Sequence, residues 1–269
     1  MYHNIGFIGC GNMGGAIARA VCKSVDPKLV RISNRTVEKA KRLAGELGCS
    51  VSTNKQIAAE CDLIILAVKP QMMADMLADI ASVLEQRNDR FVLVTIAGGL
   101  TIQSILSMAG GEYPVIRIMP NTPVAIGAGV VQMCSVGTTE EETKNFVDLM
   151  APAGLIDRLP ENLIDAASAV SGCGPALICL FMEALADGGV ACGLPRDKAL
   201  SYAAQTLLGT AKLALESGEH PGVMKDKVCS PGGTTIQGVR ALERGGLRSA
   251  TMEAVIAAFE KTLALGKGK

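Results

Sequence analysis

The first half of the chain alternates between short apolar runs and segments with helical spacing. Five runs have the length and composition of buried strands: 4–9, 29–33, 62–68, 91–97 and 113–119. Three segments between or after them repeat apolar residues every three or four positions: 12–22, 37–47 and 71–85. Because strands that alternate with helices are joined by right-handed crossovers, this pattern predicts an α/β fold, a parallel sheet with helices on both faces.

The second half of the chain has helical spacing throughout. From about Pro160 onward the apolar segments carry a 3.6-residue period, and none alternates as a strand does: 163–170, 175–193, 195–218 and 250–266. Two of these segments, 175–193 and 195–218, are apolar on nearly every side, which is typical of helices buried in a larger body. The pattern predicts a first domain over 1–159, an all-helical second domain over 160–269, and a homodimer built on the helical part.

A glycine-rich turn follows the first predicted strand. Gly9, Gly11 and Gly14 have GxGxxG spacing and open the first predicted helix. In a dinucleotide site the first glycine allows a tight turn, the second lets a pyrophosphate approach the backbone, and the third lets the helix pack on the strand. The context of strand, glycines and helix therefore predicts a Rossmann-type dinucleotide-binding domain, against the alternative of glycines that serve only a turn.

The end of the second predicted strand indicates which nucleotide is bound. NAD sites usually have an acid there that accepts hydrogen bonds from the ribose, whereas this chain has Ser33, Asn34 and Arg35. Arg35 can pair with a 2′-phosphate and its two neighbours can donate to it, so NADPH is favoured over NADH. The alternative is that Arg35 is only a solvated surface charge.

Two further strand ends carry small residues where a dinucleotide should lie. They are the segments 67–71 and 96–100, at the carboxyl ends of two apolar runs. We expect the pyrophosphate and nicotinamide near Pro70, Ala97 and Gly98. Lys69 is either a structural residue or a contact to the cofactor.

Composition narrows the class of partner. Twenty-six basic and twenty-six acidic residues cancel, so no surface field points to nucleic acid or an anionic membrane, and a small molecule is the expected partner. Nine cysteines without a CxxC pair, and two histidines, give no metal-site pattern and are typical of reduced thiols in the cytoplasm. Cys10 lies at a helix amino end, which favours a thiolate, but packing is its expected role. The amino-terminal residues do not have the pattern of an export signal.

A second loop of small residues precedes a helical run late in the chain. The segment 228–239 reads VCSPGGTTIQGV. Paired glycines let backbone amides converge at the start of a helix, and such a set of amides can bind an anion. The alternative is a well-capped helix in which the two threonines cap the first turn.

Taken together, these segments resemble the pyrroline-5-carboxylate reductase family. The resemblance rests on GFIGCGNMG, SNRT, LAVKPQ, RIMPNTP, AVSGCGPA and above all SPGGTT with its flanks, in order over essentially the whole chain. It implies NADPH-dependent reduction of a cyclic imine to L-proline, a helical domain interlocked with its twin, and larger rings of such dimers. This sequence departs from the family pattern at Cys173, Leu177 and Cys229, which leaves the packing near the substrate open.

Carried over position by position, the resemblance implies two sets of contacts. The cofactor set adds to the glycines and comprises Cys10, Asn12, Met13, Ser33, Asn54, Ala67, Val68 and Ala97. The substrate set comprises Glu161, Ser230, Gly232, Gly233, Thr234 and Thr235. Thr235 is the expected catalytic residue, with a hydroxyl that orients the C=N bond for hydride transfer.

The change of charge during hydride transfer distinguishes the reduction of an imine from the reduction of a ketone. Reduction of a ketone develops an alkoxide that needs a proton donor, and hydroxy acid dehydrogenases with this two-domain plan place a lysine in the corresponding helix. The segment 172–185 has Glu183 and no lysine. An iminium loses its charge during hydride transfer, so hydroxyls and amides suffice. The alternatives are a hydroxy acid dehydrogenase with another proton donor, and a nicotinamide-nucleotide sensor without catalysis.

Overall fold

The computed structural model describes residues 2–267, which form two compact units. The first contains the residues up to Cys173 together with those from Ala258 onward, and the second runs from Gly174 to Ala257. The helix α7 (Glu161–Ser171) belongs to the first unit. The domain boundary at 159/160 follows the change from strands to helices and stays a prediction.

The first unit is built on an eight-stranded sheet in the order β3-β2-β1-β4-β5-β6-β7-β8. Neighbouring strands are parallel except β6 and β7, which pair antiparallel. The strands are β1 (Ile5–Ile8), β2 (Val30–Ser33), β3 (Ser50–Val51), β4 (Leu63–Leu66), β5 (Val92–Thr95), β6 (Val115–Pro120), β7 (Gly129–Val136) and β8 (Gly154–Arg158). From β1 the chain continues to β2 and β3 on one side, and it then crosses to β4 on the other side of β1. A crevice therefore opens where β1 and β4 end.

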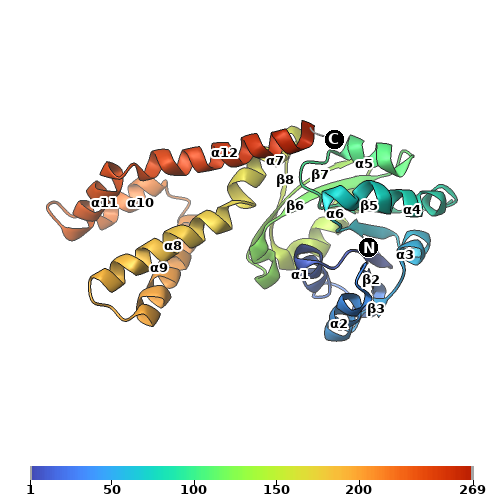
Figure 1. Cartoon of the computed structure of the whole chain (residues 1–269), viewed down its shortest axis with the longest axis horizontal. Coiled ribbons are helices and arrows are strands. Elements are labelled where there is room, and N and C mark those ends of the chain that lie inside the picture. The colour runs from blue at the N-terminus through green and yellow to red at the C-terminus, as the bar shows by residue number, and fades with distance from the viewer. Residues whose placement is uncertain (1, 268–269) are drawn as a thin grey trace. The chain divides into compact units, whose positions relative to one another are not determined.

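Helices cover both faces of the sheet, as the alternation predicts (Figure 1). Residues of β1 divide between two cores: Ile5 and Phe7 pack with α1, α2 and α6, whereas Ile8 packs with α3, α4 and α5. The helices are α1 (Asn12–Val21), α2 (Val37–Leu47), α3 (Asn54–Glu60), α4 (Met73–Glu85), α5 (Ile102–Ala109) and α6 (Glu140–Met150). Short 3₁₀ helices are η1 (Pro27–Leu29), η2 (Pro70–Met72), η3 (Thr122–Ile126) and η4 (Ala151–Ala153).

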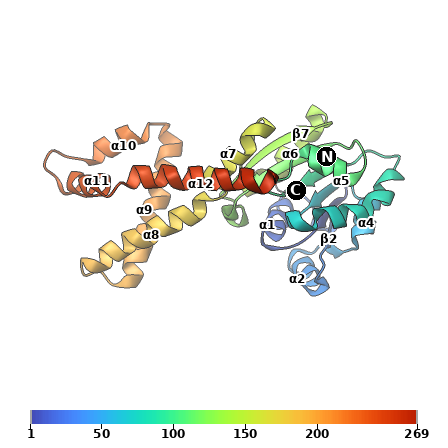
Figure 2. The same cartoon turned by 45° about the horizontal axis from the view of Figure 1, so that its top comes forward.

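The second unit is helical, as predicted. Its elements are α8 (Gly174–Ala191), α9 (Arg196–Ser217), α10 (Pro221–Val228), α11 (Thr234–Arg244) and the first part of α12 (Leu247–Lys267). The helices α8 and α9 lie side by side (Figure 2). Its buried core cluster contains Ala186, Ala199 and Ala203, whereas large apolar side chains such as Leu180 and Leu215 are exposed. A unit with so little core needs a further surface to cover its apolar side chains.

Some elements differ from the pattern-based expectation. All five predicted strands are present, but β3, β7 and β8 were not predicted. β3 has only two residues, and the segments of β7 and β8 mix polar and apolar residues without a clear period. The segment Glu161–Ala191 is long and apolar enough to cross a membrane by length and composition, and 11% of its most apolar window is buried. A helix at a subunit interface has the same composition, so this finding is weak evidence for a membrane span.

Candidate functional site

The glycine loop has the geometry that a dinucleotide site requires. Gly9 has φ +106°, and its N–H donates to the carbonyl oxygen of Ser33 at 2.8 Å. A Cβ on Gly9 would lie closer than 3.0 Å to the backbone of Ala67, and one on Gly14 would lie 2.5 Å from the carbonyl oxygen of Gly9. Both glycines therefore allow β1, β4 and α1 to approach one another.

Gly11 differs from its neighbours because the space beside it is open. It is the N-cap of α1, exposed, with φ −67°, and a Cβ there would meet nothing within 4 Å. No side chain caps this helix among the described residues, so the amides of Asn12 and Met13 are available to an acceptor. A pyrophosphate fits this place, because it needs a bare backbone, free amides and the positive end of a helix dipole.

We expect Gly11→Ala to weaken cofactor binding while leaving the fold intact. The added methyl enters the open space that we assign to the pyrophosphate, so the KM for NADPH should rise at least tenfold, about 1.4 kcal/mol. The cost to stability should be about 1 kcal/mol or less, because alanine is a poorer N-cap than glycine. Steady-state kinetics and thermal unfolding measure the two effects.

Gly14→Ala is the matched control for this prediction. It adds the same methyl, but within 3.0 Å of the side chain of Ala67 and the backbone of Gly9, so it should lower the unfolding temperature as well. A KM for NADPH that stays within about twofold in Gly11→Ala would contradict the assignment of the loop.

Several of the predicted cofactor residues lie together at the end of β2. The hydroxyl of Ser33, which is buried, donates to Oδ1 of Asn54 at 2.6 Å. Asn34 accepts from the N–H of Cys10 at 3.1 Å and donates to the carbonyl oxygen of Thr36 at 3.0 Å. The side chain of Asn34 thus holds the glycine loop against β2, a role that its sequence position did not reveal. Arg35 is exposed at the start of α2, where a guanidinium can reach a phosphate.

The ends of β4 and β5 bring the remaining predicted cofactor residues to the same edge of the sheet. Ala67 donates its N–H to the carbonyl oxygen of Ile8 at 2.8 Å, which extends the pairing of β1 and β4 by one residue. Val68 and Pro70 are half-buried, Ala97 is buried, and Lys69 and Gly98 are exposed. Parallel strands end at one edge, so these residues lie on the same side of the sheet as the glycine loop.

Burial determines the protonation state of the Cys10 thiol. Cys10 is 9% exposed, and this burial raises the pKa of its thiol, against a smaller lowering by Lys39 and Arg42. The thiol is therefore protonated near neutral pH, which agrees with a packing role rather than redox sensing.

Glu161, a predicted substrate residue, takes part in a buried ion-pair network. Its Oε1 accepts from the N–H of Ile102 at 2.7 Å and from Arg117 at 3.2 Å. Arg117 lies in the middle of β6 and also donates to Asp165 at 2.6 Å. The side chain of Arg117 is 1% exposed, that of Glu161 33% and that of Asp165 23%. These contacts fix α7 to the sheet whether or not Glu161 also contacts substrate.

Arg117 is the feature of the sequence that could have indicated this network. Arg117 interrupts an otherwise apolar strand, 113–119, and a buried arginine needs acidic partners. A cavity of about 440 Å³ adjoins the network, lined by Glu161, Cys134 and Arg158 among others. Burial, together with the charge of Glu161, raises the pKa of the Cys134 thiol to about 11.

The SPGGTT loop ends in a helix without a side-chain cap, so the alternative in which its threonines cap the first turn is wrong. The N-cap of α11 is Gly233, and Thr234 and Thr235 are its first two helical residues. Gly232 has φ +68°, which favours glycine, and Gly233 donates its N–H to the carbonyl oxygen of Ser230 at 3.0 Å. No side chain caps the helix among the described residues, so the amides of Thr234 and Thr235 remain free for an anion.

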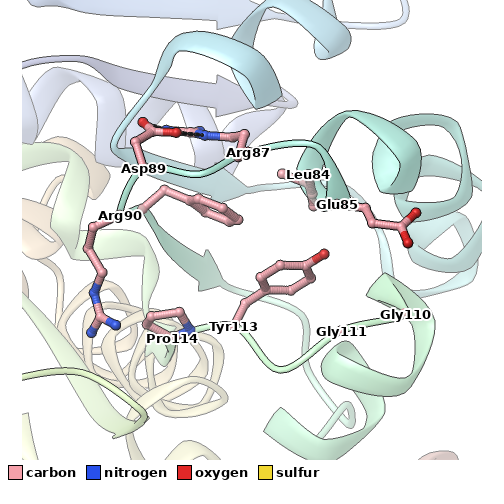
Figure 3. A pocket seen from close by; sticks show the side chains of 10 residues that line it. Leu84, Glu85, Arg87, Asp89, Arg90, Gly110, Gly111, Tyr113 and Pro114 are labelled. Carbon is pink, nitrogen blue, oxygen red and sulfur yellow. Dashed lines mark hydrogen bonds and ion pairs between the residues drawn. The ribbon is translucent and has the colours of Figure 1, made fainter.

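A second cavity lies at the opposite edge of the sheet and is structural. It has a volume of about 330 Å³ and lies before β5 and β6 (Figure 3). Arg87 donates to Asp89 at 2.9 Å and to the carbonyl oxygen of Cys61 at 2.6 Å, and its guanidinium lies 4.4 Å from the ring centroid of Phe91. Tyr113 packs on the same ring at 5.2 Å. Arg87, Asp89 and Arg90 line the cavity and are paired within the protein, Arg90 with Glu142, so three of its four charged side chains are already engaged.

Comparisons with known proteins cover both parts of the chain. Residues 161–265 match the family described as pyrroline-5-carboxylate reductase dimerisation, and residues 4–98 match NADP oxidoreductase coenzyme F420-dependent. The pyrroline-5-carboxylate reductase of Escherichia coli (strain K12) is 39% identical over 99% of this chain and 100% of its own length. That of Arabidopsis thaliana is 40% identical over 98% of this chain and 95% of its own.

A solved structure is similar over the same extent. It is the pyrroline carboxylate reductase of Plasmodium falciparum with NADP bound, which is 32% identical with a TM-score of 0.85. The match covers 98% of this chain and 98% of that one.

Proposed function

The chain belongs to the pyrroline-5-carboxylate reductase family, and we propose that it carries out the reaction of that family with the residues described above. It reduces 1-pyrroline-5-carboxylate to L-proline with a reduced nicotinamide cofactor. The observation that carries this conclusion is the extent of the similarity, which includes the nucleotide-binding unit and the helical unit alike. A similarity confined to residues 4–98 would have indicated only a nicotinamide enzyme.

We assign the cofactor to the uncapped amino end of α1 and the substrate to the uncapped amino end of α11. In the first unit, the amides at the start of α1 hold the pyrophosphate of the cofactor. In the second, the amides of Thr234 and Thr235 hold the α-carboxylate of the substrate, and Ser230 contributes its hydroxyl. When bound, the reduced nicotinamide supplies the hydride that reaches the imine carbon. The hydroxyl of Thr235 orients the ring nitrogen.

The residues present favour an imine over a ketone as the reducible group. The helices α7 and α8 contain no lysine, and the acidic residues of α7, Glu161 and Asp165, are engaged by Arg117. An iminium is already protonated, so its reduction needs no side-chain acid. Neutral hydroxyls and main-chain amides are the groups that suit such a substrate.

Turnover of the cyclic imine tests the proposal directly. The protein is incubated with pyrroline-5-carboxylate and NADPH, and loss of the reduced nicotinamide is followed by absorbance. A 2-oxo acid and a 3-hydroxy acid are assayed in parallel, the latter with the oxidised cofactor. Faster turnover of either acid would make the chain a hydroxy acid dehydrogenase, and cofactor binding without any turnover would make it a sensor.

The preference for NADPH over NADH rests on Arg35 in this proposal. Arg35→Asp should raise the KM for NADPH about tenfold, ~1.4 kcal/mol, because a carboxylate would repel the 2′-phosphate. The KM for NADH should change much less, because NADH has a hydroxyl there. Lys41→Asp, the same charge change on the exposed face of α2, is the matched control. Equal effects of Arg35→Asp on both cofactors would show that Arg35 is only a surface charge.

The assembly and its compartment are part of the proposal. The chain forms a homo-oligomer, and a second copy covers the apolar side chains that the second unit exposes, including those of α8. We propose dimers that assemble into a larger ring, which light scattering on the purified protein would test. A cytoplasmic location is supported by nine free cysteines. The apolar segment Glu161–Ala191 would then face a partner subunit rather than lipid, and recovery of the protein in the membrane fraction would contradict this.

A further inference from the structure

Two cysteines outside the proposed site have their sulfur atoms in contact. Sγ of Cys22 and Sγ of Cys49 are 3.4 Å apart, the one contact between cysteine sulfurs within residues 2–267. Cys22 follows the last turn of α1, and Cys49 lies between α2 and β3. Both are half-buried, so a small molecule in solution can reach them.

The backbone at both cysteines is held in place independently of the sulfur contact. Cys22 donates its N–H to the carbonyl oxygen of Ala18 at 2.9 Å, and Cys49 donates to that of Ala44 at 3.0 Å. Gly48, with φ +79°, ends α2 and turns the chain so that Cys49 faces α1. Forming the bond would bring the sulfurs from 3.4 Å to about 2.05 Å, and the held backbone leaves rotation of the two side chains to supply this change.

A second cross-link runs beside the sulfur pair. Arg19 lies three residues before Cys22, and Glu46 lies three residues before Cys49. The guanidinium of Arg19 donates to both carboxylate oxygens of Glu46, at 2.8 and 2.7 Å. This bidentate pair links the carboxyl ends of α1 and α2 beside the two sulfurs.

We propose that Cys22 and Cys49 are a dithiol that a small disulfide oxidises reversibly to an intramolecular disulfide, which locks the carboxyl ends of α1 and α2 together. The thiolate of Cys49 attacks one sulfur of the small disulfide, forms a mixed disulfide and expels one thiolate. Cys22 then loses its proton and attacks Sγ of Cys49, which expels the second thiolate. Two protein thiols are oxidised, one small disulfide is reduced to two thiols, and the two protons pass to the leaving groups.

The order of attack follows from the hydrogen bond between the thiols. Either sulfur can donate in this bond, which lowers the pKa of the Cys49 thiol and raises that of the Cys22 thiol. Cys49 is therefore the better attacking group and Cys22 the resolving one. The glycine loop lies at the other end of α1, about 15 Å away along a helix of ten residues. The disulfide therefore stabilises the nucleotide-binding unit without entering the proposed site.

Peptide mapping tests the bond. The native protein is treated with oxidised glutathione, free thiols are alkylated, and the protein is digested with trypsin without reduction. Cleavage after Arg19, Lys23, Arg42 and Lys55 should yield residues 20–23 joined to 43–55, and dithiothreitol should separate them. Cys22→Ser and Cys49→Ser should each lose this species. Cys192→Ser, which removes an exposed cysteine, should keep it.

Two further measurements separate a lock from an incidental oxidation. Glu46→Gln breaks the bidentate pair and should slow formation of the linked peptide several-fold. Oxidation should raise the unfolding temperature of the wild type by several degrees and leave that of Cys22→Ser unchanged. Cys22 and Cys49 recovered alkylated, or Cys49 recovered only as its glutathione adduct, would overturn the proposal, as would equal temperature shifts in both proteins.

Discussion

Replacing Arg117 by methionine should lower the free energy of unfolding by about 3 kcal/mol. The change removes the partner of two carboxylates, those of Glu161 and Asp165, and leaves a buried strand position without a charge. Losing one member of a buried ion pair costs about 3–5 kcal/mol, and the lower end applies because both carboxylates are partly exposed. At fixed protein concentration the unfolding temperature should fall by about 6–12 °C.

The penalty comes from the unpaired carboxylates rather than from the loss of arginine itself. Nε of Arg117 has no hydrogen-bond partner within the described part of the chain, so burial of this side chain is already costly. Methionine has a similar shape and is readily buried. A triple variant, Arg117→Met with Glu161→Gln and Asp165→Asn, should therefore recover most of the lost stability.

The two variants together decide the role of the network. Thermal unfolding of the single variant, the triple variant and the wild type is compared by calorimetry. If the free energy of unfolding of the single variant is less than about 1 kcal/mol below that of the wild type, the ion pairs contribute little to stability. A triple variant as unstable as the single one would place the loss in packing rather than in charge.

The parts of the fold that the sequence predicted are those specified by local geometry. Gly9, Gly11 and Gly14 each meet a different local requirement, a positive φ, an open cradle and a close approach of helix to strand. Because these requirements lie within six residues of chain, their spacing is visible in the sequence. The alternation of strands and helices is visible for the same reason, since each element carries its own period.

The parts that the sequence did not predict depend on residues far apart in the chain. Arg117 pairs with residues 44 and 48 positions later, and no local pattern connects them. Cys22 meets Cys49 only because α1 and α2 cover the same face of the sheet. The alternative in which the threonines cap α11 is wrong by a single position, because Gly233 occupies the N-cap.

Removing the hydroxyl of Thr235 should lower kcat about a hundredfold, ~2.7 kcal/mol, with little change in the KM for the imine. Thr235→Val keeps the shape of the side chain and its β-branch, so α11 should start at the same residue. The α-carboxylate is assigned to main-chain amides, which this substitution leaves in place. Only the orientation of the ring nitrogen is lost, and that interaction matters most as the imine is reduced.

Neighbouring substitutions distinguish this role from general damage to the loop. Thr235→Ser should restore most of kcat, because it restores a hydroxyl at the same carbon. Thr234→Val should leave kcat near the wild-type value, whereas Ser230→Ala should raise the KM with a smaller effect on kcat. Steady-state kinetics with pyrroline-5-carboxylate measures all four variants. A Thr235→Val enzyme that keeps more than about half of kcat would remove Thr235 from the reaction, and equal losses in the two valine variants would trace the effect to the conformation of the loop.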